Sequence, residues 1–229
     1  MALNVVEKID ERVKVGHVLV SLSDKTGLDR LISGLVRVNP SVMIYSTGGT
    51  YQAIRALLGE ANAARNLTSV SDYTGQPEMQ GGLVKTLDFK IYLGLLSETY
   101  NDAHAADLKR VKGVAFDLVV VNLYPFRETV AKPGVTPEEA RTNIDIGGPC
   151  MLRASAKNFL RVASVSDPRD YGRVLEELER SNGCLSLQTR FELACKTFKH
   201  TAEYDASIAA YLASRECPDV KACYRFAGR

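Results

Sequence analysis

The chain has 229 residues, of which 45% are hydrophobic and 24% charged, and its formal net charge is +2. This length is enough to bury a sizeable core in one large domain or two small ones. The balanced charge argues against a protein dedicated to nucleic-acid binding, which usually carries a basic patch or stripe. No stretch approaches the about 20 consecutive apolar residues of a membrane span, and residues 1–16 lack the apolar block of a signal peptide.

The five cysteines indicate a cellular compartment. They form no CxxC pair, and an odd number in a chain of this length favours reduced thiols and a cytoplasmic location. The nearest approach to a metal-ligand spacing is Cys195 with His200, which is a weak signal, so no metal is expected. His200, on a predicted helix, is expected to be structural or exposed.

Two strand–turn–helix units open the chain. Residues 17–21 are a short apolar run typical of a buried parallel strand, and the turn at 21–27 leads into a helix over 28–38. A second strand over 42–45 runs directly into the turn at 46–50. The helix that follows is predicted to place three apolar side chains on one side, Ile54, Leu57 and Leu58.

The second of these turns, Ser46-Thr47-Gly48-Gly49-Thr50, predicts an anion site. A strand, a turn of hydroxyl groups and glycines, and a helix together present backbone N–H groups and a helix dipole to a bound anion. No Walker lysine follows, so a sugar phosphate or nucleotide monophosphate fits better than a triphosphate. The alternative is a glycine turn with an N-cap threonine.

The middle of the chain combines a long loop with the strongest strand signal. Residues 71–87 are rich in Gly, Pro, Ser and Asp, and a loop of this length is commonly functional. The apolar run at 116–123 predicts a strand whose carboxyl end delivers Asn122 and Tyr124 to the ligand-binding edge of an open α/β sheet. The helix between them is predicted to turn three residues inward, Ala105, Leu108 and Val111.

Residues 143–158 place Asp145 just before a Gly147-Gly148 pair and a helix that begins near Pro149. Lys157 ends this helix about 12 Å farther on at ~1.5 Å per residue, and its side chain leans back toward the helix N-terminus. We therefore expect its amine to face Asp145 across a space the size of a planar heterocycle, with free glycine amides on the floor. The alternative is a helix entry with a surface lysine.

The remaining elements complete a single α/β domain. A short helix at 136–139 carries an N-cap threonine, Thr136, and a proline at its first position. A strand over 162–166 and helices over 168–180 and 187–214 follow. The expected organisation is an N-terminal extension at 1–16, a domain at 17–213 and a C-terminal tail at 214–229 that trails over the surface.

Several ordered sequence words together resemble one enzyme family. They are SLSDKTG (21–27), STGGT (46–50), SDYTGQPEMQGGLVKTL (71–87), NLYPFRETVAKPGVT (122–136), NIDIGGP (143–149), LRASAKN (152–158) and KHTAEYD (199–205). In these words the chain resembles the IMP cyclohydrolase domain of the bifunctional AICAR transformylase/IMP cyclohydrolase family, here apparently as a stand-alone cyclohydrolase.

The resemblance implies a fold, a reaction and partners. The fold would be methylglyoxal-synthase-like, with a parallel sheet covered by helices on both faces. The reaction would be dehydrative ring closure of 5-formamidoimidazole-4-carboxamide ribotide to inosine monophosphate (IMP), with no metal or organic cofactor. The expected assembly is a homodimer that binds neither nucleic acid nor membrane, with a separate formyltransferase polypeptide as a possible partner.

The resemblance also implies site residues. Phosphate contacts would come from Ser21, Ser23, Lys25, Thr47, Gly48, Gly49, Thr50 and Thr86. The purine-side floor would be Asn122, Asp145, Ile146 and Gly147. Of the four chemistry residues, Lys157 would be the oxyanion donor and Asp145 would orient or deprotonate the amide, while Tyr124 and Lys85 would relay protons.

Each of these residues also has a structural interpretation. Tyr124 could cap a strand, Lys85 could be a solvated loop lysine, and Asn122 could tie down its own turn. Tyr204 and Asp205 are expected to be packing or interface residues rather than part of the site.

The chain departs from the family pattern in the long loop. Where the family usually reads GRVKTLHPKIHGG, this chain reads GLVKTLDFKIYLG, with the substitutions at Leu83, Asp88, Phe89 and Tyr92. The family has an arginine at the position of Leu83, and its loss removes a bidentate phosphate donor. Two alternatives stay open. One is a phosphate-eliminating lyase of the methylglyoxal synthase type, which would share the fold and the phosphate loop. The other is a non-catalytic nucleotide-binding regulatory module, which the changes at Leu83 and Asp88 keep open.

Overall fold

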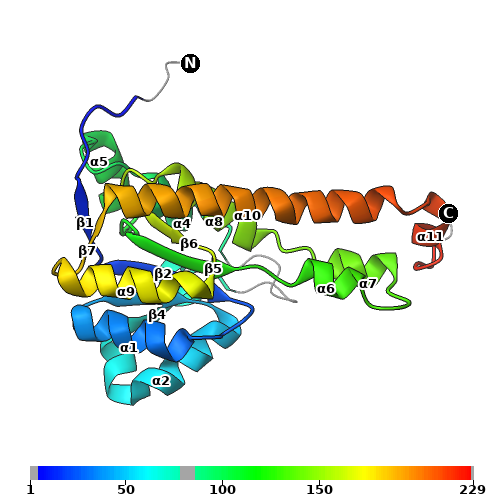
Figure 1. Cartoon of the computed structure of the whole chain (residues 1–229), viewed down its shortest axis with the longest axis horizontal. Helices are drawn as coiled ribbons and strands as arrows, with labels where there is room; N and C mark the ends of the chain where they lie inside the picture. The colour runs from blue at the N-terminus through cyan, green and yellow to red at the C-terminus, as the bar shows by residue number, and fades with distance from the viewer. Residues whose placement is uncertain (1–4, 78–85, 228–229) are drawn as a thin grey trace.

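The computed structural model describes residues 5–77 and 86–227, and its centre is a five-stranded parallel sheet between layers of helices (Figure 1). The strand order is β4-β3-β2-β5-β6. The strands are β2 (His17–Leu22), β3 (Met43–Ser46), β4 (Leu67–Ser69), β5 (Leu118–Asn122) and β6 (Ala163–Val165). The predicted α/β class with a parallel sheet is confirmed.

The strands are apolar on both faces because both faces are covered. Val18 and Val20 belong to one hydrophobic core with α1 (Leu28–Val38), α2 (Gly48–Asn66) and α9 (Tyr171–Arg180). Leu19 points to the opposite face, where the second core includes residues of α4 (Phe89–Leu96) and α8 (Gly147–Lys157). Successive side chains of β2 thus alternate between the two cores, as the pleat of a strand requires.

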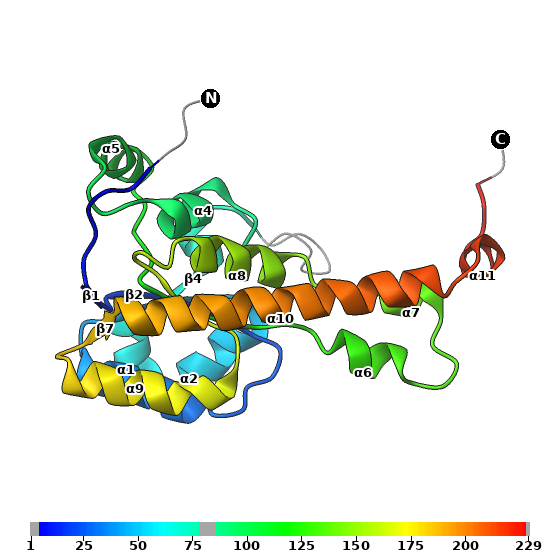
Figure 2. The same cartoon turned by 45° about the horizontal axis from the view of Figure 1, so that its top comes forward.

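Helix α10 (Leu187–Ala213) packs along α8 and β6 and continues well past the sheet (Figures 1 and 2). Its 27 residues span about 40 Å at ~1.5 Å per residue. The C-terminal half of α10 forms an arm with α6 (Phe126–Val130) and α7 (Pro137–Thr142), which lie beside it. A small separate core holds the arm together, made of Phe126, Ala140, Tyr204 and Tyr211.

Two terminal segments are more ordered than the sequence suggests. Within the expected N-terminal extension, β1 (Arg12–Lys14) pairs antiparallel with β7 (Cys184–Ser186). Within the expected tail, α11 (Cys217–Lys221) forms a short helix, and the hydroxyl of Tyr224 beyond it donates to Glu138 on α7. The tail therefore contacts the arm.

The short remaining elements are α3 (Val70–Thr74), α5 (Asp102–Arg110) and the 3-10 helix η2 (Pro168–Asp170). The prediction that the helix at α5 turns an apolar face inward is wrong, because none of its residues is buried. On α2, Ile54 is buried as predicted, whereas Leu57 is about half exposed. Within the described ranges, no helix combines the length and the apolar character needed to cross a membrane.

Candidate active site

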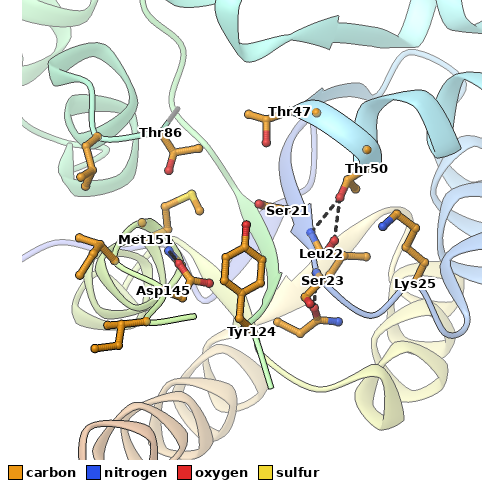
Figure 3. Close-up of a pocket in the computed structure, with 18 of the residues that line it drawn as sticks. Ser21, Leu22, Ser23, Lys25, Thr47, Thr50, Thr86, Tyr124, Asp145 and Met151 are labelled. Carbon is orange, nitrogen blue, oxygen red and sulfur yellow. Dashed lines mark hydrogen bonds between the residues drawn. The ribbon is translucent and has the colours of Figure 1, made fainter. Parts of the chain in front are cut away.

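A cavity of about 370 Å³ opens at the carboxyl ends of β2, β3 and β5 (Figure 3). The chain leaves β2 toward β3 on one side and later returns to β5 on the other, so this is the switch point of the sheet, where open α/β sheets bind ligands. The lining residues are Ser21, Leu22, Ser23, Lys25, Thr47, Gly48, Gly49, Thr50, Thr86, Leu87, Asn122, Tyr124, Thr142, Ile144, Asp145, Ile146, Gly147, Gly148 and Met151. Every predicted site residue except Lys85 and Lys157 is among them.

One side of the cavity combines a lysine with the start of a helix. Helix α2 begins at Gly48, whose φ of 48° favours glycine, and the side chain of the N-cap residue Thr47 makes no capping hydrogen bond. The first amides of α2 are therefore left for a ligand. The Lys25 ammonium lies over this turn, since a Cβ placed on Gly49 would be 4.0 Å from its Nζ. Within residues 5–77 and 86–227, Lys25 forms no salt bridge.

Two lining residues serve mainly to shape this side. The Thr50 hydroxyl accepts from the Leu22 N–H and donates to the Leu22 carbonyl oxygen, each at 3.0 Å. The Asn122 side-chain oxygen accepts from the N–H groups of Ser23 (2.7 Å) and Asp24 (3.0 Å), and its amide donates to the Asp24 carbonyl at 2.6 Å. Both side chains therefore join neighbouring elements, and the ligand contacts expected of them stay predictions.

Asp145 lies on the side of the cavity opposite Thr50 and Lys25 (Figure 3). Its Oδ1 accepts a hydrogen bond of 2.8 Å from the Gly148 N–H. Burial raises the pKa of Asp145, whereas hydrogen bonds from the backbone N–H groups of Gly148 and Tyr124 oppose that rise. The expectation of a free Gly148 amide is wrong, because this N–H is already used to hold the carboxylate.

The glycine at position 148 is required by this contact. A Cβ placed there would lie 2.5 Å from Oδ2 of Asp145 and 2.7 Å from a methyl carbon of Leu123. Gly147 is almost as restricted, since its Cβ would lie 2.9 Å from the Thr86 hydroxyl. The Gly-Gly pair thus allows Asp145 and Thr86 to approach the start of α8.

Lys157 is not brought to the cavity. It is an exposed residue in the last turn of α8, whereas the cavity touches only the first turns of that helix, through Gly147, Gly148 and Met151. Ten residues of helix separate Gly147 from Lys157, about 15 Å at ~1.5 Å per residue, which exceeds what a lysine side chain recovers by leaning back. The predicted pairing of its amine with Asp145 across the cavity is wrong for this chain.

The other predicted residues line the cavity, except Lys85, which lies outside the described residues. Ser21, Ser23, Thr47, Thr86, Tyr124, Ile146 and Gly147 all line the cavity. Tyr124 and Ile146 are half-exposed at its surface. Lys85 and the substituted position Leu83 lie outside the described residues. Asp88 has a structural role, since its side chain accepts from the Lys90 N–H at 2.7 Å and caps α4.

Sequence reasoning missed several contributors. Thr142, Ile144 and Met151 line the cavity beside the predicted Asp145 turn. Met151 lies four residues after Gly147, so helical spacing could have identified it. Tyr204, expected to be a packing or interface residue, accepts a hydrogen bond of 2.8 Å from the Asp145 N–H. Nothing in the sequence signals this contact, because the residues come from elements far apart in the chain.

The arrangement suits a ligand with an anionic end and a hydrogen-bonding end. Lys25 and the helix N-terminus complement a phosphate, and the Asp145 carboxylate can accept a hydrogen bond or a proton about a cavity's width away. Among the described residues, no group of three or more His, Cys, Asp or Glu is placed to hold a metal ion.

Comparison with known proteins gives this geometry a family. The MGS-like domain model matches residues 27–150, and the AICARFT/IMPCHase bienzyme model matches residues 155–227. The chain belongs to the MGS-like domain family, as an IMP cyclohydrolase-type domain like that of the AICARFT/IMPCHase bienzyme. The predicted fold and family are thereby confirmed.

Curated relatives of this MGS-like chain are much longer than it is. The bifunctional purine biosynthesis protein PurH of Trichormus variabilis is 48% identical over 198 residues, which cover 86% of this chain and 38% of the relative. The PurH protein of Neisseria gonorrhoeae is 46% identical over 200 residues, which cover 87% and 36%. The chain therefore spans less than two fifths of the length of these relatives.

A solved structure of similar length also matches. The crystal structure of ForH superimposes with a TM-score of 0.69 at 33% identity, covering 85% of this chain and 97% of that chain. The MGS-like fold is thus shared along nearly the whole of that protein.

Proposed function

We propose that the chain is an IMP cyclohydrolase, which closes the ring of 5-formamidoimidazole-4-carboxamide ribotide to form IMP and water. The observation that carries the proposal is one cavity with an anion site at Lys25 and α2 on one side and the buried carboxylate of Asp145 on the other. The purine-biosynthesis relatives support the choice of a purine ribotide.

Ring closure joins the carboxamide nitrogen to the formyl carbon. The carboxamide and formamide nitrogens each lose one proton, and the formyl oxygen leaves as water with both. Because the reaction is intramolecular, holding the two groups in contact already supplies much of the rate gain. Asp145 would accept a hydrogen bond or the proton from the carboxamide nitrogen, and its raised pKa makes it a stronger base than an ordinary Asp.

The other groups would serve the leaving oxygen. The Tyr124 hydroxyl, half-exposed at the cavity surface, is proposed to donate a proton, and Lys85 remains a proposed partner in that relay. The N–H of Gly147 is the proposed backbone donor to the developing oxyanion, in place of Lys157.

The substrate must come from a formyl-transfer reaction, because it is a formylated amine. A separate formyltransferase polypeptide is a possible source. The homodimer inferred from the family stays a prediction, which analytical ultracentrifugation would check.

The test is a spectrophotometric cyclisation assay with the formylated ribotide. The chain should form IMP, and Asp145→Asn should lower kcat by a factor of about 10² or more. Asp205→Asn is the matched control, since Asp205 is an exposed residue of α10 away from the cavity, and it should behave like the parent. In the pH dependence of kcat for the parent, the fall on the acidic side should occur at a higher pH than an ordinary Asp would give, because burial raises the pKa of Asp145.

Other outcomes would change the assignment. IMP binding without turnover would indicate a regulatory module, and formation of methylglyoxal from dihydroxyacetone phosphate would indicate a lyase. Full cyclisation by Asp145→Asn would remove this residue from the mechanism.

A further inference from the structure

Tyr204 connects the arm to the candidate active site. It lies on α10 and is 8% exposed, and its hydroxyl oxygen accepts a hydrogen bond of 2.8 Å from the backbone N–H of Asp145. The same hydroxyl donates toward the Asn143 carbonyl oxygen at 3.4 Å. One oxygen atom on α10 therefore holds both sides of residue 144, in the turn that carries the carboxylate.

Among the described residues, the Tyr204 hydroxyl is the one hydrogen-bond partner found for the Asp145 backbone N–H. Its side chain is held from within the cavity wall, by the N–H groups of Gly148 and Tyr124. No α10 residue is among those that line the cavity in the described part of the chain. Tyr204 thus affects the site without lining the cavity, because it fixes the position of the Asp145 backbone.

We infer that Tyr204 is a positioning residue for ring closure, whose hydroxyl fixes the Asp145 carboxylate where the carboxamide nitrogen must meet it. The inference rests on the proposed cyclohydrolase function. Displacement of a catalytic group by about 1 Å, through a change away from the reacting atoms, can lower a rate by ~10²-fold.

Tyr211 separates this role from simple packing. It lies two turns farther along α10, is 7% exposed, and packs edge-on against Phe126 at 5.9 Å between ring centres. Tyr204 packs against the same ring at 6.2 Å. Among the described residues, the buried Tyr211 hydroxyl has no hydrogen-bond partner. Conversion of either tyrosine to phenylalanine removes one oxygen atom, but only at position 204 does it remove the link to Asp145.

The first experiment compares the kinetics of the two variants. Tyr204→Phe should lower kcat by about 10- to 100-fold while KM stays within about twofold, because the phosphate side of the cavity is untouched. Tyr211→Phe should keep the kcat and KM of the parent. Equal kinetics for the two variants would overturn the inference, as would an equal rise in KM and fall in kcat for Tyr204→Phe.

The second experiment does not need turnover. Amide hydrogen exchange, followed by mass spectrometry, should be faster over residues 143–148 in Tyr204→Phe and unchanged there in Tyr211→Phe. If the parent fails to cyclise the ribotide, the proposed function fails, but this measurement still decides whether the hydroxyl anchors the Asp145 turn. Unchanged exchange in Tyr204→Phe would overturn the anchor itself.

Discussion

Lys25 and the first amides of α2 occupy the same corner of the cavity, and the contribution of the lysine there can be measured separately. A phosphate that does not react is bound equally in the ground state and the transition state. Loss of a contact to it should therefore raise KM and leave kcat nearly unchanged. We expect Lys25→Met to raise the KM for the ribotide by about 10-fold or more, the effect of one charge-assisted hydrogen bond, with kcat changed little.

The control for this prediction is Lys109→Met, which removes an exposed lysine in the last turn of α5. Initial-rate kinetics of both variants would check it. A KM for Lys25→Met equal to that of Lys109→Met would show that the phosphate does not bind at the start of α2.

At this scale, the sequence predicted residue types better than it predicted contacts. Lys25 and Gly48 were identified because they follow strand ends, which must converge at a switch point, whereas Asp145 was identified by its place before the Gly147-Gly148 pair and by the family resemblance. A structural role was considered for Asn122, but in its own turn; its contacts with residues 23 and 24, like the contact of Thr50 with Leu22, depend on which backbone groups of a neighbouring segment need a partner. Lys157 was misplaced for a geometric reason, since a residue ten positions along a helix is carried away from the site.

At the scale of the elements, the contact between α2 and β2 fixes the relative position of two walls of the cavity. Thr50 satisfies both the N–H and the carbonyl of Leu22, and all three groups are buried. Thr50→Val keeps the side-chain shape but leaves the Leu22 N–H without a partner. We expect a loss of about 1–3 kcal/mol in the free energy of unfolding, measured by urea denaturation.

Thr68→Val on β4 is the matched control. Within the described part of the chain, the Thr68 hydroxyl makes one hydrogen bond, a weak one to the Met43 sulfur at 3.4 Å, so this variant should unfold close to the parent. Equal stability of the two valine variants would contradict the role assigned to Thr50.

Among the elements, those with clear periodicity were predicted and those without it were missed. The helix over 28–38 was predicted to the residue because its apolar stripe is complete. β1 and β7 are three residues each, too short to show alternation, and they form only because the two segments meet. The prediction of an inward apolar face on α5 was wrong because that helix is mostly polar and none of its residues is buried.

At the scale of the whole molecule, one buried arginine joins three segments that are far apart in the chain. Arg190 is 0% exposed, and its guanidinium donates to the carbonyl oxygens of Asp10, Glu11, Phe159, Leu160 and Leu185. Lysine has three donors and no planar fork, so Arg190→Lys must leave some of these carbonyls without a partner. We expect a loss of about 3 kcal/mol or more in the free energy of unfolding, measured by urea denaturation.

Arg173→Lys is the control, since Arg173 makes an exposed salt bridge with Glu192 on the surface of α10. It should change the stability by less than about 1 kcal/mol. A loss for Arg190→Lys no larger than that of Arg173→Lys would show that the five carbonyls are satisfied in another way.

The sequence predicted one α/β domain, but it could not predict the hydrogen bonds of Arg190 to five carbonyl oxygens. An arginine within a helix normally indicates a solvated face, and here the carbonyl partners lie on three separate segments. The parallel sheet and the expected place of a ligand at its carboxyl edge followed from general rules for such sheets, whereas the strand order and the interior polar contacts depend on the finished packing.

The long helix α10 has one further consequence. Arg190 near its start and Tyr204 in its second half are fourteen residues apart, close to four turns at ~3.6 residues per turn, so both lie on the same side of the helix. A single inserted or deleted residue between them would rotate one relative to the other by about 100°. Loops absorb such length changes, but this stretch cannot, so homologous chains that keep both contacts must conserve its length as strictly as its amino acids.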